Sequence, residues 1–106
     1  MEDRHMPTPR LSDAAIEAAL RSAELAGWRL VNGKLHRDYE FADFRAAMGY
    51  MVEVALHVER MDHHPEWFNV YNKVVVDLTT HDAGGVSARD IELASVMERL
   101  AAQRAK

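Results

Sequence analysis

The sequence has no cysteine, only three prolines and five glycines, and no long apolar run. Without cysteine it can form neither a disulfide nor a thiolate metal site, a composition that fits a reducing compartment, so we expect a cytoplasmic protein. No stretch reaches the roughly 18 apolar residues of a membrane helix. The first nine residues are polar and do not resemble a secretory signal. We therefore expect neither membrane insertion nor secretion.

An excess of basic residues is also absent. Thirteen Lys and Arg stand against 17 Asp and Glu, which gives a formal net charge of -4. Nucleic-acid binding needs a basic footprint, so we expect no nucleic-acid partner. The length of 106 residues indicates one domain with a modest core. We expect a flexible, polar arm over residues 1–10 and a single domain over residues 11–106.

The spacing of apolar and turn residues predicts the order of the elements. Ser12 suits a helix N-cap, and Asn32-Gly33 is a strong hairpin signal because both residues tolerate positive φ. The predicted elements are helices over 13–26 and 42–61, strands on either side of Asn32-Gly33 and over 67–71 and 73–80, and a last helix opened by Ser87. The order α-β-β-α-β-β-α predicts an α+β fold, with three helices on one face of a four-stranded antiparallel sheet.

The helix predicted over 42–61 is apolar on more than one side of its cylinder. Such a helix packs on more than one side. In a domain this small, a second copy of the chain is the expected second partner. The two edge strands of the sheet are further places where a copy can pair. The sequence therefore predicts a homo-oligomer.

Three of the six histidines are the candidate catalytic residues. His63 and His64 follow the long predicted helix, and His81 follows the last predicted strand, so all three are expected at one rim of the sheet. Imidazole, with an unperturbed pKa of about 6.5, both accepts and donates protons near neutral pH. A reaction that takes a proton from one atom and gives a proton to another needs both a base and an acid. Two or three imidazoles supply both, so we expect no cofactor.

Each of these signals has an alternative interpretation. Three histidines suit zinc with an open fourth position, but adjacent histidines lack the i, i+4 spacing of a helical zinc motif, so we predict no metal. Ser87-x-x-Asp90 resembles a capping box, so Asp90 either caps the last helix or supports the site. Glu59, on the last turn of the long helix, is either solvated or supports the site.

The spacing Glu59-x3-His63-His64-Pro65-x5-Tyr71-x9-His81-x8-Asp90 resembles the signature of the pterin-4a-carbinolamine dehydratases at every position. The continuous string from Asp62 to Val74, the pair Thr80-His81 and the opening of the last helix are also typical of that family. The resemblance is dense over 59–97 and looser but collinear from the first helix onward. It covers most of the chain.

The resemblance implies a hydro-lyase and a quaternary structure. The family's members remove water from 4a-hydroxytetrahydrobiopterin to give quinonoid dihydropterin, and so recycle the pterin cofactor of aromatic amino acid hydroxylases. They form dimers through sheet edges and tetramers through the long helix, which implies a homodimer or homotetramer here. The alternative function is a non-catalytic protein-binding, assembly or dimerisation module of the same fold.

The resemblance also assigns residues to the site. The residues implied to line the pterin pocket are Asp62, His63, His64, Trp67, Thr79, Thr80, His81 and Asp82. His63 and His81 would lie nearest the 4a-hydroxyl as acid or base, their individual roles left open, and His64 would position the ring. Glu59 and Asp90 are the supporting candidates.

The chain departs from the animal members in one place. After Thr80-His81 they often carry Glu-Cys, where this sequence has Asp82-Ala83. No step of the dehydration needs a thiol, so the histidine chemistry is unaffected. The difference weakens only the expectation that this chain shares the animal proteins' second role, as a dimerisation cofactor of a homeodomain transcription factor.

Overall fold

The computed structural model describes residues 8–104 of the chain. Its elements are α1 (Asp13–Leu20), the 3-10 helix η2 (Ala23–Leu25), β1 (Arg29–Val31), β2 (Lys34–Glu40), α2 (Phe44–Met61), β3 (Glu66–Val70), β4 (Lys73–Leu78), the 3-10 helix η3 (His81–Ala83) and α3 (Ala88–Arg104). This order confirms the predicted one. Most of the arm predicted over 1–10 lies outside the described residues; at its end, Arg10 pairs with Ser87 in an isolated β-bridge.

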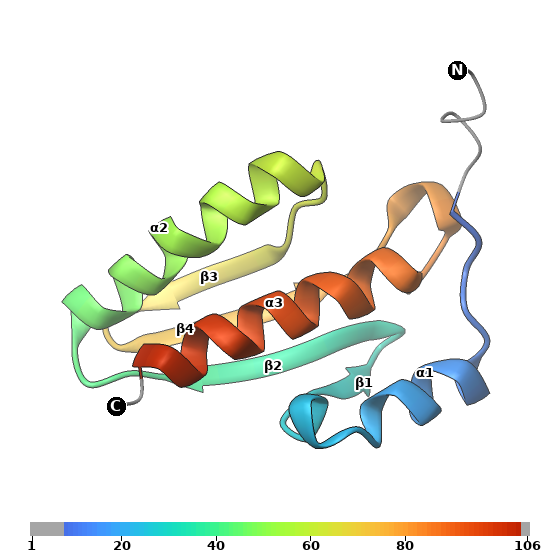
Figure 1. Ribbon diagram of the computed structural model, residues 1–106, viewed down its shortest axis with the longest axis horizontal. Helices are drawn as coiled ribbons and strands as arrows, with labels where there is room; N and C mark the ends of the chain where they lie inside the picture. The colour runs from blue at the N-terminus through green and yellow to red at the C-terminus, as the bar shows by residue number, and fades with distance from the viewer. Residues whose placement is uncertain (1–7, 105–106) are drawn as a thin grey trace.

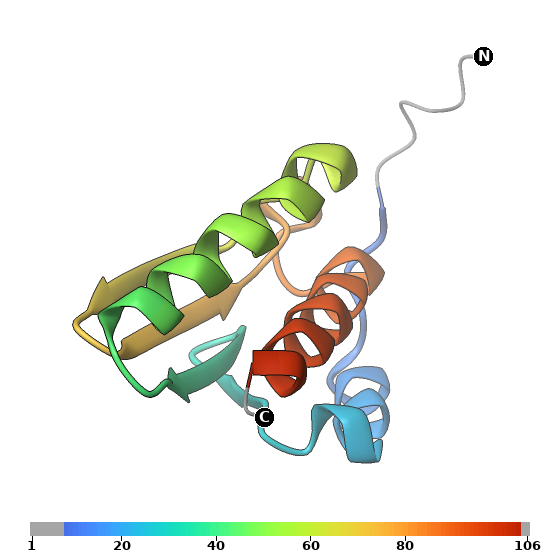
Figure 2. The ribbon, with the colours of Figure 1, turned by 60° about the vertical axis from the view of Figure 1, so that its left-hand side comes forward.

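The four strands form one antiparallel sheet in the order β1-β2-β4-β3. All three α-helices cover the same face of this sheet, and α3 lies between α2 and α1 (Figures 1 and 2). The α+β fold class is therefore confirmed. Asn32 (φ 52°) and Gly33 (φ 79°) both adopt the left-handed conformation that a tight hairpin turn requires, as predicted.

Strand alternation places the core between the sheet and the helices. The helix-facing side chains Leu35, Val74, Val76 and Leu78 are fully buried, whereas Lys34, His36, Asp38 and Glu40 of β2 lie on the opposite face. Tyr50 of α2 is also fully buried, and its hydroxyl donates a hydrogen bond of 3.0 Å to the Met97 carbonyl of α3. This bond ties together the two long helices that cover the sheet.

The predicted ends of four elements were wrong. The strand predicted over 67–71 spans Glu66–Val70, because Tyr71 adopts the left-handed conformation (φ 51°) of the turn that follows. The first helix ends at Leu20, because Ser22 adopts an extended conformation (ψ 148°) and a separate 3-10 turn follows. The last strand ends at Leu78, two residues early, because Thr80 pairs with Gly85 to close the next loop. The long helix begins at Phe44, where the Asp43 side chain accepts a hydrogen bond from the Ala46 N–H at 2.9 Å.

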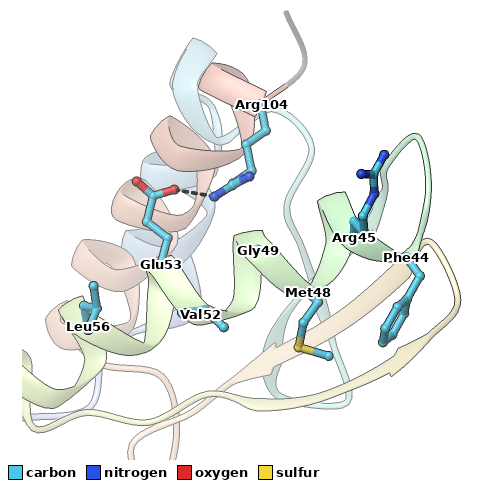
Figure 3. A pocket seen from close by; sticks show the side chains of 8 residues that line it. All are labelled: Phe44, Arg45, Met48, Gly49, Val52, Glu53, Leu56 and Arg104. Atoms are coloured by element: carbon cyan, nitrogen blue, oxygen red, sulfur yellow. Dashed lines mark ion pairs between the residues drawn. The ribbon is translucent and has the colours of Figure 1, made fainter.

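Helix α2 has two apolar faces, as its sequence predicts. One face, with Tyr50 and Val54, is buried against the core. The other carries large apolar side chains at every fourth residue, all of them exposed: Phe44, Met48, Val52 and Leu56. Figure 3 shows this second stripe beside an ion pair of 3.3 Å between Glu53 and Arg104 of α3. We call these four side chains the α2 stripe; it lines an open groove of about 540 Å³.

Across residues 8–104, the structure contains no helix that combines the length and the apolar character needed to cross a membrane.

Candidate active site

The turn that follows α2 is built to hold two histidines in place. Asp62 adopts the left-handed conformation (φ 53°) and ends the helix, three residues before Pro65. The Arg89 side chain of α3 donates hydrogen bonds to the carbonyls of Met61 (3.3 Å) and Asp62 (2.6 Å). These bonds satisfy carbonyls that a helix end leaves without partners. They also anchor the backbone from which His63 and His64 project.

Asp90 lies at the centre of a buried hydrogen-bond network. Its side chain is completely inaccessible. Oδ1 lies 2.6 Å from His63 Nε2, while Oδ2 accepts hydrogen bonds from the Thr80 hydroxyl (2.7 Å) and the Ser87 backbone N–H (2.9 Å). The Ser87 hydroxyl accepts in turn from the Arg89 N–H (3.2 Å), so the capping arrangement is present. Asp90 therefore caps α3 and contacts His63 at the same time.

The contact with Asp90 determines how His63 can act. A carboxylate only accepts hydrogen bonds, so an ionised Asp90 requires the proton on Nε2 of His63. Nδ1 is then the ring nitrogen that can exchange a proton with a ligand. His63 is only 7% exposed, so its ring is held by packing as well as by the carboxylate. The carboxylate orients the His63 ring in the way that an aspartate orients histidine in hydrolases.

The other two histidines are exposed. Their side chains are 62% (His64) and 84% (His81) accessible. His64 Nε2 lies 3.6 Å from Glu59 Oε1, and His81 Nε2 lies 3.5 Å from Glu66 Oε2. Each of the three imidazoles thus has a carboxylate within 4 Å of its Nε2. Glu59 and Asp90 were sequence candidates for support, but Glu66 was not.

The three histidines share one open cleft of about 220 Å³. It is lined by Asp62, His63, His64, Thr79, Thr80, His81, Asp82 and Arg89. Typical pockets for drug-sized ligands are about 300–1,000 Å³, so this cleft suits a small ring system. Among the described residues that line it, only Arg89 was not foreseen from the sequence.

Trp67 is the one expected pocket residue that lies elsewhere in the described part of the chain. Alternation along β3 puts it on the helix-facing side of the sheet, opposite Val76, where it is half-buried and packs against the core. Its assignment as a wall of the pterin pocket stays a prediction.

The donor set at this cleft suits proton transfer better than metal binding. Within residues 8–104, no three His, Asp or Glu side chains converge as metal ligands would. His63 Nε2 is already engaged by Asp90. The cleft offers imidazoles, hydroxyl groups and carboxylates, which are the groups of general acid–base chemistry.

Comparison with known families gives this chemistry a context. The family profile described as pterin 4 alpha carbinolamine dehydratase matches residues 9–100. The chain belongs to this family.

Individual relatives agree with the profile. A protein of Solibacter usitatus is 57% identical over 90% of this chain and 98% of its own length, and one of Novosphingobium aromaticivorans is 56% identical over 88% and 97%. Both are named, by inference, pterin-4-alpha-carbinolamine dehydratases.

A solved structure of the same family supports the fold. The crystal structure described as a transcriptional coactivator/pterin dehydratase from Brucella melitensis is 45% identical to this chain, with a TM-score of 0.81. The match covers 87% of this chain and 98% of that one. The sheet and three helices described above are thus the fold of a dehydratase family, a class of hydro-lyases.

Proposed function

We propose that this chain dehydrates 4a-hydroxytetrahydrobiopterin to quinonoid dihydropterin, by general acid–base catalysis at the three-histidine cleft. The proposal rests on membership of the dehydratase family, and one observation carries its mechanism. The buried His63–Asp90 pair borders the same cleft as His81. Two differently held imidazoles therefore face one small space, as a reaction with two proton transfers requires.

In the proposed reaction the pterin nitrogen loses its proton to one imidazole. The electron pair released forms a carbon–nitrogen double bond as the carbon–oxygen bond at position 4a breaks. The departing hydroxyl takes a proton from the other imidazole and leaves as water, so no electrons are exchanged. His63 and His81 are the two partners, with either able to act first, and His64 holds the ring. Asp90 keeps His63 in one orientation and one tautomer.

The experiment that tests this function is turnover of chemically generated 4a-hydroxytetrahydropterin by the purified protein. We expect quinonoid dihydropterin, followed by its absorbance, to form well above the rate in buffer alone. In the cell this reaction would return the pterin cofactor of aromatic amino acid hydroxylases to use, and we place it in the cytoplasm. A rate equal to that of buffer would contradict the proposal.

A second candidate function is protein binding. The Brucella melitensis protein carries the description of a coactivator as well as a dehydratase. In this chain the exposed α2 stripe is the surface that such a role would use. A protein that binds a partner through this stripe but fails the turnover assay would favour the second function over the first.

We predict that activity does not depend on a metal ion. Prolonged treatment with a chelator, followed by its removal, should leave kcat and KM unchanged, because imidazoles alone carry the protons in the proposed mechanism. The measurement is steady-state turnover before and after treatment, with added Zn²⁺ as the control. Activity lost on chelation and restored by Zn²⁺ would show that the metal interpretation is correct.

We propose that the α2 stripe joins copies of the chain into the homo-oligomer expected for the family. Val52→Glu should therefore yield a smaller species by light scattering, because Val52 is 57% exposed and a carboxylate there would be buried in the contact. The matched control is Ala18→Glu, at an exposed position of α1, which should leave the mass unchanged. Val54, on the other face, is fully buried, so its replacement would test stability instead. An unchanged mass for Val52→Glu would overturn this assembly.

A further inference from the structure

His81 has little in the fold to hold its ring. It is the first residue of η3, and its side chain is largely solvent-exposed. Among the described residues, its one charged partner within 4 Å is Glu66, the first residue of β3, at 3.5 Å from Nε2. A proton-transfer group in a catalytic cleft needs a defined position. Glu66 is the group that can provide it.

Glu66 is itself anchored. Its Oε1 accepts a hydrogen bond of 2.6 Å from Lys34 Nζ of β2, while Oε2 faces His81. The hydrogen bond from Lys34, with a smaller contribution from His81, lowers the pKa of Glu66 and keeps it a carboxylate. The two oxygens thus have separate partners. Lys34 binds one oxygen and so fixes the carboxylate with its other oxygen towards His81.

The sheet register explains why Lys34 reaches Glu66. Glu66 lies opposite Asp77 of β4, and Asp77 lies opposite His36 of β2, all on the sheet face away from the helices. Asp77 is already engaged by His36, with Oδ1 at 2.9 Å from Nδ1. Lys34, two residues before His36 on the same face, is therefore left to cross β4 and bind Glu66.

We propose that Glu66 is a positioning residue for His81, holding the Nε2 side of the ring while Lys34 anchors the carboxylate from the other side. The kinetic part of this inference rests on the proposed function. Each of the two proton-transferring imidazoles then has its own carboxylate, a buried one for His63 and a solvent-facing one on a strand for His81.

The expected effect is moderate because the contact is exposed. Solvent-exposed ion pairs contribute at most about 1 kcal/mol, which corresponds to a change in rate of about two- to fivefold. The other charged or titratable groups lining the cleft are Asp62, His63, His64, Asp82 and Arg89, and none of them changes in the test. Any change in the NMR signals of the His81 ring then reports on Glu66.

The test compares Glu66→Gln with Glu40→Gln, which removes the same charge from the same sheet face at the far end of β2. For Glu66→Gln we expect kcat to fall about two- to fivefold with KM within twofold. The NMR chemical shifts of the His81 ring should change, because the ring loses the charged neighbour at its Nε2 side. Glu40→Gln should change neither. In a His81→Ala background, Glu66→Gln should have no further effect on kcat.

Three outcomes separate this inference from the proposed function. If the wild type turns over substrate and Glu66→Gln changes neither the NMR signals of the His81 ring nor kcat, the role of Glu66 is overturned and the dehydratase stays intact. A fall in kcat that is equally large with and without His81 would also overturn it, since Glu66 would then act through the fold. Changed NMR signals of the His81 ring in a protein without turnover would support the pairing of His81 with Glu66 while the proposed function fails.

Discussion

Asp90→Ala is expected to lower the free energy of unfolding by about 3–5 kcal/mol and to abolish measurable turnover. Asp90 is completely buried, and one carboxylate serves His63, Thr80 and the Ser87 N–H. Its removal leaves three buried polar groups without that acceptor and frees the ring of His63. Urea unfolding followed by circular dichroism measures the first effect, and steady-state kinetics measures the second.

Two further variants make this prediction specific. Asp90→Asn keeps the volume but replaces one acceptor oxygen with a donor, so it should fold and still lose about 10²–10⁴-fold in kcat. The matched control Asp82→Ala removes an exposed carboxylate from the same cleft and should change stability by no more than about 0.5 kcal/mol. An Asp90→Ala protein with wild-type stability, or an Asp90→Asn protein with wild-type kcat, would contradict the role given to this network.

His63→Ala and His81→Ala should each lower kcat by about 10²–10⁴-fold, because each removes one of two proton-transferring groups. Their effects on stability should differ. His63 is buried and bonded to Asp90, so its loss should cost about 1–3 kcal/mol, whereas His81 is exposed and its loss should leave the melting temperature unchanged. Both variants should remain folded. Kinetics and melting curves of the same samples test both statements.

His64→Ala serves as the comparison for these two variants. Its proposed work is holding the ring, and its contact with Glu59 is long and exposed, so the change should raise KM and leave kcat nearly constant. A large fall in kcat at constant KM would instead place His64 among the proton-transferring groups.

Local chemistry explains why most of the fold could be predicted from the sequence. Asn32-Gly33 specifies a hairpin, and the alternation of Leu35 and Tyr39 with charged residues specifies which face of β2 is buried. The end of the first helix before Ser22 could not be predicted, because the helical spacing of apolar residues continues past Ser22. The early end of β4 depends on a bridge between Thr80 and Gly85, which only the closed loop reveals.

The candidate site was predictable as far as it lies at the ends of elements. His63, His64 and His81 come together because a helix and a strand end at the same rim. The second contact of Asp90 could not be foreseen, since a capping box alone accounts for a carboxylate at that position, and His63 is 27 residues away. Glu66 was not predicted either, because nothing in the sequence indicates its contact with His81.

The alternation of β3 explains both Glu66 and Trp67. Neighbours along a strand point to opposite faces, so Trp67 turns into the core and Glu66 turns to the side that His81 reaches. The sequence predicted Trp67, and not Glu66, as a residue of the site. The arginine that caps α2, Arg89, was missed because its carbonyl partners lie 27 and 28 residues away.

The most direct test of the central claim is the rate at which a His63→Ala/His81→Ala double variant dehydrates 4a-hydroxytetrahydropterin, measured beside the wild type in one assay. We expect the double variant, folded by circular dichroism, to fall to the uncatalysed rate while the wild type exceeds it many-fold. A folded double variant with the kcat of the wild type would show that the three-histidine cleft does not carry out the dehydration.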